Sequence, residues 1–160
     1  MRLGDIAIDE ELAIQLCKET SIVKPVPAAH QFENSLETQL PFLQCLKNDF
    51  HIVPTCLKKV DFPICKKLSE GIVKALEQTG KAALVNASSD MTHFESHRII
   101  EEKDKKAIIK VENRETLGLY ETVRKEQISM YGVNPVTVML LCWEKLGEQK
   151  AELIEYKTSG

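Results

Sequence analysis

The sequence has few aromatic residues, no excess of basic charge and no long apolar run. Aromatic side chains make up 6% of its 160 residues, and the formal net charge is −3. This balance gives no electrostatic footprint for nucleic acid or for an anionic lipid surface. No apolar stretch approaches the ~20 residues that a membrane-spanning helix needs. We therefore expect no nucleic-acid partner, no membrane partner and no signal peptide.

The short motifs of several common enzyme classes are missing too. The chain contains no GxGxxG, no GxxxxGK[ST], no GxSxG and no HExxH. The first two place glycine-rich loops around phosphates, and the third exposes a nucleophilic serine on a tight turn. Nothing in the sequence therefore predicts a nucleotide-binding enzyme or a serine hydrolase.

The cysteines do not form a disulfide framework. They are odd in number and contain no CxxC pair: Cys17, Cys45, Cys56, Cys65 and Cys142. Small secreted proteins usually carry an even set at regular spacings. We therefore predict reduced thiols in a cytoplasmic protein. Cys56 and Cys65 could approach a metal ion, but they lack the close spacing of a zinc knuckle.

What is present is an ordinary supply of core-forming residues. Hydrophobic residues make up 43% of the chain and charged residues 28%, which is typical of globular proteins. A chain of this length predicts one domain, over residues 1–160. Area scaling gives a folded surface of about 8,000 Å² for a compact chain of this mass.

Short apolar runs alternate with longer helical segments. Helices are expected over 9–19, 34–47, the stretch between Asp61 and Gly80, 95–112, 114–127 and 134–146. Strands are expected over 5–8, 22–26, 51–57, 82–87 and 151–156. The 82–87 run is short and mostly apolar, as in a strand that is buried on both faces. This alternation predicts an α/β fold, with helices packed around a largely parallel or mixed sheet.

Two of these helical segments carry further local signals. In 34–47, Asn34 and Glu37 have the spacing of a capping box, and Pro41 should kink or split the helix. In 95–112, charges of alternating sign fill positions 101–106. Such a run is typical of a solvated helix face.

The densest polar patch follows the 82–87 run, where ligands collect in parallel sheets. It contains Ser88, Ser89, Asp90, His93 and His97. If a helix begins near Asp90, the carboxylate and both imidazoles share one face. A carboxylate can orient an imidazole as a general base, a proton shuttle or a metal ligand. Alternatively, these polar side chains only cap a helix.

Four motifs, in this order, resemble the Memo family, which is also named AmmeMemoRadiSam system protein B. ENSLETQLPFLQ at 33–44 resembles the family's EHSxExQLPFLQ, and SSDMTHF at 88–94 resembles SSDxSHY/F. SMYGVNPV at 129–136 resembles SMCGxGPV, and 151–160 resembles the closing KAxLLxYxTSGD strand. The resemblance covers nearly the whole chain and corresponds to roughly the C-terminal three-fifths of a member.

The resemblance implies a fold and a site. Memo proteins are similar to class III extradiol dioxygenases of the LigB type, so the expected fold is a truncated α/β sandwich. The family pocket holds iron or copper on two histidines and one cysteine, beside the Asp and His of SSDxSH. By this match Asp90 and His93 are the candidate catalytic residues. The residues expected to line the pocket are Asn34, Glu37, Ser88, Ser89 and Tyr131.

The sequence departs from the family at the metal ligands. The two family histidines lie upstream of the segment that matches residues 3–5, and the family cysteine falls on Tyr131. A neutral phenol with a pKa of about 10 is a poor replacement for a thiolate. The histidine of EHS falls on Asn34. We therefore expect no metal ligands and no cofactor, with iron or copper only if His30 or His97 rebuilds the site.

Three functional hypotheses remain open. The first is a Memo-like binding or assembly module, with a homo-oligomer or a partner chain covering the truncated sheet. The alternative is a metal-dependent, dioxygenase-like oxidoreductase, or a metal-free acid–base catalyst, that uses a pocket around Asp90 and His93. The third is anion or phosphopeptide binding at a helix N-terminus after Ser88 and Ser89, which the Asp90 charge opposes.

Overall fold

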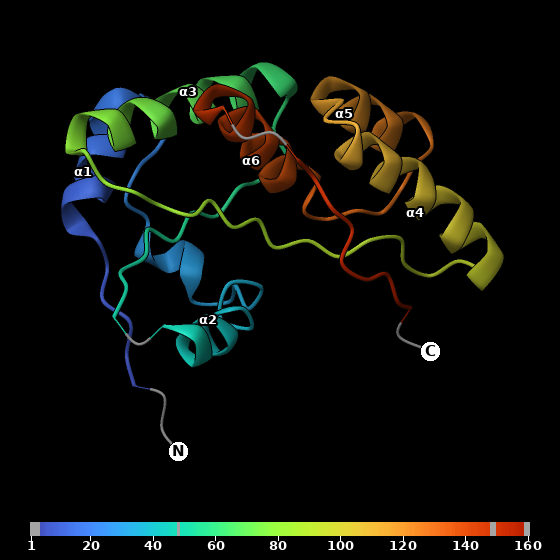
Figure 1. Ribbon diagram of the computed structural model, residues 1–160, viewed down its shortest axis with the longest axis horizontal. Coiled ribbons are helices and arrows are strands. Elements are labelled where there is room, and N and C mark those ends of the chain that lie inside the picture. Colours follow the sequence, from blue (N-terminus) through green and yellow to red (C-terminus); the bar gives the residue numbers. More distant parts are fainter. Residues whose placement is uncertain (1–3, 48, 148–149, 159–160) are drawn as a thin grey trace.

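A computed structural model describes residues 4–47, 49–147 and 150–158 and shows a layer of helices above a layer of extended segments (Figure 1). The helices are α1 (Glu10–Glu19), the 3-10 turn η1 (Pro27–His30), α2 (Leu40–Leu46), α3 (Phe62–Thr79), α4 (His97–Glu112), α5 (Thr116–Lys125) and α6 (Val133–Leu146). Contacts join α1 to α3, α3 to α6, α6 to α5, and α5 to α4. These five helices form the upper layer, which we call the helical layer.

The ends of these helices follow from the sequence. Asp9 caps α1 by accepting a hydrogen bond from Leu12 N at 3.0 Å, and Asp61 caps α3 through Ile64 N at 3.2 Å. Gly80 ends α3 with a φ of 63°, a left-handed conformation that favours glycine. The predicted helices over 9–19, 95–112, 114–127 and 134–146 are confirmed, with ends that differ by a few residues.

The helix predicted over 34–47 is only half correct. Residues 35–39 form turns, and α2 begins at Leu40 with Pro41 in its first turn, where a missing N–H costs no hydrogen bond. The predicted capping box is wrong, because Glu33 accepts the hydrogen bonds, from Ser35 N at 2.7 Å and Leu36 N at 3.2 Å. Burial raises the pKa of Glu33, but these bonds and one from the Ser35 hydroxyl outweigh it and lower the pKa.

The predicted α/β sandwich around a sheet is wrong for the chain as described. In residues 4–47, 49–147 and 150–158 no β-strand forms, and the only strand-like pairing is one parallel bridge between Ile8 and Ile52. Its hydrogen bonds run from Ile52 N to Ala7 O at 3.0 Å and from Asp9 N to Ile52 O at 2.9 Å. The five predicted strands are non-helical segments, which we call the extended layer: 5–8, 22–26, 51–57, 82–87 and 151–156. A strand pairs its backbone with a neighbour about 4.8 Å away, and apart from that bridge no such pairing joins these segments in the described part of the chain.

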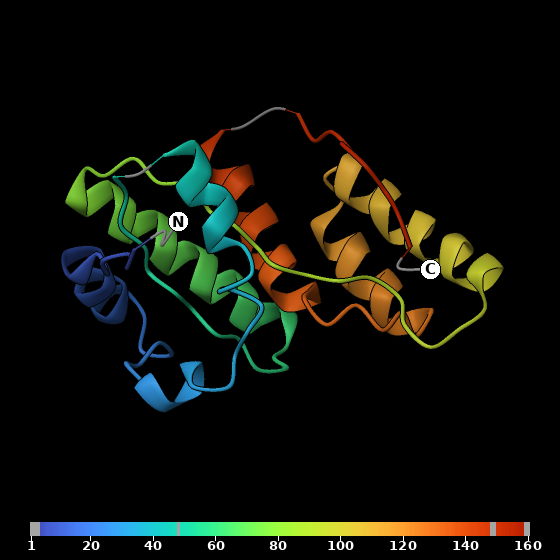
Figure 2. The ribbon, with the colours of Figure 1, turned by 90° about the horizontal axis from the view of Figure 1, so that it is seen from below.

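The 82–87 segment differs most from its prediction. Its sequence predicts a central strand covered on both faces, yet Leu84 is 82% exposed. The segment runs beneath the helical layer and continues toward the start of α4 (Figure 2). Val85 and Ala87 pack against the buried clusters of the helical layer, whereas Leu84 is exposed to solvent.

The core lies within the helical layer and is centred on α6. One buried cluster joins α6 to α1 and α3 through Leu16, Leu68 and Leu141, among others. A second joins α6 to α4 and α5 through Ala107, Leu119 and Leu140. Among the residues described, no helix is long and apolar enough to cross a bilayer.

The chain exposes far more surface than its mass predicts. Its accessible surface is 11158 Å², against about 8,000 Å² for a compact chain of this size. Several large apolar side chains of the extended layer contribute to this surface: Ile8, Val26, Leu84, Leu153 and Ile154. The extended layer therefore presents apolar side chains to water.

Candidate functional site

The structure brings Asp90 and His93 into direct contact. His93 Nε2 lies 2.8 Å from Asp90 Oδ2, and the two side chains are 37% and 49% exposed. The contact is not aligned as a hydrogen bond, so the buried Nε2 atom has no hydrogen-bond partner among the described residues. Both side chains of the pair are therefore partly exposed to solvent, and one imidazole nitrogen has no hydrogen-bond partner among the described residues.

The segment before α6 positions this pair. His93 N donates a hydrogen bond to Ser129 Oγ at 2.7 Å, and Tyr131 N donates to Asp90 Oδ1 at 3.4 Å. The His93 ring lies near two aromatic rings, with its centroid 5.7 Å from that of Phe94 and 5.8 Å from that of Tyr131. Two of the motifs that carry the family resemblance therefore form one site.

Gly132 allows these two motifs to pack closely. It caps the N-terminus of α6 and lies against Ser88 and Ser89. A Cβ atom at this position would lie 2.5 Å from the Ser88 carbonyl oxygen, closer than real Cβ contacts. A side chain at position 132 would push the Ser88–Ser89 backbone away from the start of α6.

The helix expected near Asp90 does not form there. Residues 88–96 are non-helical, Phe94 adopts a φ of 62°, and α4 begins at His97. Asp90 and His93 therefore meet across an irregular loop, and His97 instead pairs with Glu101, with Nε2 3.3 Å from Oε1. No helix begins directly after Ser88 and Ser89, so the helix N-terminus that the anion hypothesis expected there is absent from the described residues.

The other residues expected to line the pocket fall into two groups. Ser88, Ser89 and Tyr131 adjoin the pair, and Tyr131 is 74% exposed. Asn34 and Glu37 are exposed, and no described contact joins their side chains to Asp90 or His93. The link from that segment to the site is made by Gln39, whose Nε2 donates to Ser88 Oγ at 3.5 Å.

Asp104 is buried, whereas the sequence predicts a solvated helix face at its position. It belongs to the charged run at 101–106, yet it is only 1% exposed. Its Oδ1 accepts hydrogen bonds from Thr92 N at 3.0 Å and Thr92 Oγ1 at 2.5 Å, and Oδ2 accepts one from Tyr156 OH at 2.8 Å. Burial and the bond to Asp104 raise the pKa of Tyr156 to about 12. Asp104 thus ties the residue before His93 and the C-terminal segment to α4.

The fold also brings a second histidine, His30, into contact with a cysteine. His30 Nδ1 lies 3.3 Å from Cys56 Sγ, which joins η1 to the 51–57 segment. Burial and the nearby Glu33 charge raise the pKa of the Cys56 thiol. A raised pKa keeps the thiol protonated at neutral pH, so this pair lacks the thiolate that a nucleophilic cysteine needs.

The side chains of the described residues do not supply the ligands of the metal site that the resemblance implies. A non-haem iron site of the common type needs two histidines and a carboxylate around one position. Within residues 4–47, 49–147 and 150–158, no group of three or more His, Cys, Asp or Glu side chains converges in this way. Asp90 and His93 supply two donors, and Tyr131 occupies the place of the family cysteine.

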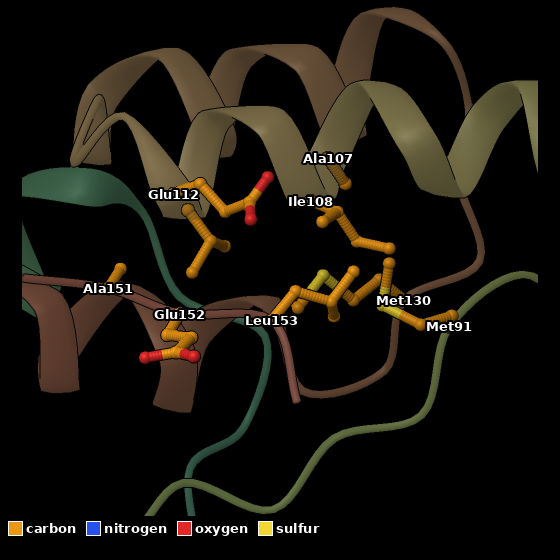
Figure 3. Close-up of a pocket in the computed structure, with 9 residues that line it drawn as sticks. Met91, Ala107, Ile108, Glu112, Met130, Ala151, Glu152 and Leu153 are labelled. Atoms are coloured by element: carbon orange, nitrogen blue, oxygen red, sulfur yellow. The ribbon is translucent and has the colours of Figure 1, made fainter. Parts of the chain in front are cut away.

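A small apolar pocket lies beside the site, between α4 and the C-terminal segment (Figure 3). Its volume is about 140 Å³, and its lining includes Met91, Met130 and Leu153. Met91 and Met130 belong to the two motifs that hold Asp90 and His93. The pocket therefore adjoins the 88–96 loop through Met91, and neither Asp90 nor His93 lines it.

Comparison with known proteins agrees with the motifs assembled here. The family model for Memo-like proteins matches residues 2–160. The chain belongs to the Memo family. The family resemblance seen in the four motifs is thereby confirmed.

Archaeal relatives define how much of a Memo protein this chain represents. MEMO1 family proteins of Ignicoccus hospitalis, Saccharolobus solfataricus and Methanopyrus kandleri are 39%, 37% and 34% identical to it over 99% of its length. The chain spans 56% of the length of each of them. No solved structure matches the chain.

Proposed function

We propose that this Memo-family chain is a binding or assembly module whose extended layer is its interaction surface. The observation that supports this most strongly is the exposure of large apolar side chains along the extended layer, with Leu84 82% and Ile154 88% exposed. Exposed apolar patches of this kind mark protein interaction sites, because leaving them in water is unfavourable. The Asp90–His93 pair lies on the chain segment that continues from Leu84.

A cytoplasmic location agrees with the cysteine chemistry. All five cysteines are free. Burial raises the pKa of Cys65 to about 11 and that of Cys142 to about 12, which keeps both thiols protonated. Such buried thiols are typical of a protein from a reducing compartment.

A surface test addresses the binding proposal directly. We expect the purified chain to bind an apolar-surface dye and to self-associate at tens of micromolar, measured by fluorescence and sedimentation velocity. Leu84→Lys should weaken both, because it places a charge on the extended layer. The matched control is Leu117→Lys, at a 48% exposed site on α5, which should change neither. A monomeric chain that binds no dye would contradict the proposal.

The second candidate function is catalysis at Asp90 and His93. The observation that favours it is the 2.8 Å contact between a carboxylate and an imidazole, with one nitrogen left unsatisfied. Asp90 would orient the ring, and His93 would take or give a proton. A metal-dependent, dioxygenase-like reaction would need further donors from outside the described residues.

Replacing each histidine separates catalysis from structure. If the enzyme hypothesis is right, His93→Ala should abolish turnover or metal uptake and leave the melting temperature nearly unchanged. His97→Ala is the control, because His97 is exposed and pairs only with Glu101 at the start of α4. Elemental analysis of iron, copper and zinc, on protein without a histidine tag, gives the metal content. A His93→Ala chain that only unfolds would assign His93 a structural role.

A further inference from the structure

We infer that the pocket between α4 and the C-terminal segment binds a small arylalkyl amine, with the aromatic ring inside the pocket and the ammonium group at Glu112. The inference goes beyond the proposed interaction surface, because neither Leu84 nor Ile154 lines this pocket. The ligand class follows from three features of the pocket, which are its size, the sulfur atoms in its lining and the charge at one end.

The size of the pocket suits a single six-membered ring. Its volume is about 140 Å³, and an apolar cavity of about 150 Å³ in another protein takes up benzene. The walls on the helical side are part of the core, since Ala107 is 0% and Met130 6% exposed. The C-terminal segment is held to α4 by the hydrogen bond from Tyr156 OH to Asp104 Oδ2 at 2.8 Å. The pocket can therefore accept one ring with a short chain, but not a larger ligand.

Two methionines favour an aromatic ring over an aliphatic group of the same size. Met91 and Met130 lie together at one end of the pocket, with Leu153 and Ile108 beside them (Figure 3). A thioether sulfur makes a favourable contact with an aromatic ring at about 5 Å, and the flexible methionine side chain adapts to the shape of its neighbour. An aromatic ring therefore gains these sulfur contacts in addition to the burial of its apolar surface.

The other end of the pocket carries negative charge. Glu112 and Glu152 lie there (Figure 3), and none of the residues that line the pocket in the described part of the chain is Lys, Arg or His. Lys150 Nζ lies 3.3 Å from Glu152 Oε2, whereas the Glu112 carboxylate has no partner among the described residues. Glu112 is also the last residue of α4, and the C-terminal end of a helix attracts cations. The pocket therefore selects a cation over an anion.

An alkyl ammonium group meets this requirement. Such amines have a pKa of about 10, as in lysine, and are protonated at neutral pH. One or two methylene groups can join the ammonium group at Glu112 to a ring that lies against the methionines. Benzylamine and phenethylamine are the simplest molecules with this arrangement.

The test titrates benzylamine and matched compounds into the full chain, labelled with ¹³C at the methionine methyl groups. We expect benzylamine to shift the Met91 and Met130 methyl NMR signals with a dissociation constant of about 0.1–1 mM. Met139 does not line the pocket, and its signal should stay nearly unmoved. Phenylacetate, with the same ring and the opposite charge, and propylamine, without a ring, should each bind at least about tenfold more weakly. Cyclohexylmethylamine, which lacks aromaticity, should bind about two- to tenfold more weakly.

Three variants test the residues. Glu112→Gln should weaken benzylamine binding about two- to fivefold, as expected for a partly exposed ion pair. Glu102→Gln is the matched control, because Glu102 lies on the same helix, is 65% exposed and does not line the pocket. Ala151→Leu adds volume from the non-helical C-terminal segment, so it should abolish the methyl shifts and leave the melting temperature nearly unchanged.

Three results would overturn the inference. They are benzylamine that leaves the Met91 and Met130 signals unmoved, phenylacetate that binds as tightly as benzylamine, and Glu112→Gln that binds benzylamine as tightly as the wild type. Leu84→Lys, which tests the interaction surface, should leave benzylamine binding intact. The two proposals can therefore fail independently of each other.

Discussion

The helical layer and the extended layer are both built from apolar runs, yet the first buries its large apolar side chains and the second leaves several of them exposed. Leu140 of α6 is 1% exposed and Leu84 of the extended layer is 82% exposed. A helix pairs its own backbone through bonds between residues four apart, so it needs only an apolar stripe and a neighbour. A strand needs other strands for its hydrogen bonds. The difference shows that local pattern suffices for one layer and that the other depends on chain beyond its own segment.

Polar contacts join the helices to the segments beneath them. Asp104 on α4 holds Thr92 and Tyr156, which both belong to non-helical segments. At the other end of the molecule, Asp9 at the start of α1 pairs with Lys81, at 2.6 Å between Oδ1 and Nζ. These links tie Tyr156 of the extended layer, and Lys81 directly before the 82–87 segment, to the helices, although strand pairing is nearly absent among the described residues.

The largest expected effect comes from truncating one leucine in each layer, Leu140 in the core and Leu84 at the surface. Leu140→Ala should lower the free energy of unfolding by about 2–5 kcal/mol, because it leaves a cavity in the core. Leu84→Ala should change it by less than about 0.5 kcal/mol, as at an exposed position. Urea unfolding followed by circular dichroism measures both. Equal losses at the two positions would show that the extended layer is covered in solution.

A smaller effect is expected at the buried link. Asp104→Ala leaves the Thr92 and Tyr156 donors without their acceptor and should cost about 1–3 kcal/mol of stability. It should also shift the NMR signals of the His93 imidazole, because Thr92 directly precedes His93. Glu102→Ala on the same helix, where the side chain is 65% exposed, is the control and should do neither. An unchanged His93 spectrum in Asp104→Ala would show that Asp104 does not position the site.

The smallest effect concerns pH. The hydrogen bond from Lys81 and that from Leu12 N lower the pKa of Asp9 below 3.8. The stabilisation by this carboxylate is therefore complete above the unfolded-state pKa and is lost as the pH falls through the lower folded-state value. Thermal unfolding between about pH 5 and pH 2 should lose less stability in Lys81→Gln than in the wild type. Lys150→Gln, which removes the exposed pair with Glu152, should match the wild type.

Much of the fold was open to prediction from local signals. Asp9, Asp61, Gly80 and Gly147 mark helix ends, and the structure uses them at those positions. Whether the apolar runs pair as strands was not open to prediction, because such a run shows only that a segment suits an extended conformation. For the helix expected over 34–47, Pro41 marks the start of α2 and not a kink, because a proline fits best in the first turn of a helix.

The candidate site was predictable in part. The SSDMTHF motif pointed to Asp90 and His93, and the structure places them 2.8 Å apart. Their geometry was not predictable, because the loop bends at Phe94 and is held by Ser129 from a distant segment. Asp104 gave no usable signal, since a charge within a charged run is normally solvated.

The sequence by itself determined the family, the helical segments with their caps, and the identity of the two residues at the centre of the site. Only the tertiary structure decided which apolar runs are covered, which carboxylate is buried and which histidine meets which partner. The physical reason is the separation along the chain between the residues that interact. Capping and helical hydrogen bonds join residues within one turn of each other, whereas strand pairing, burial and ion pairs depend on segments far apart in the chain.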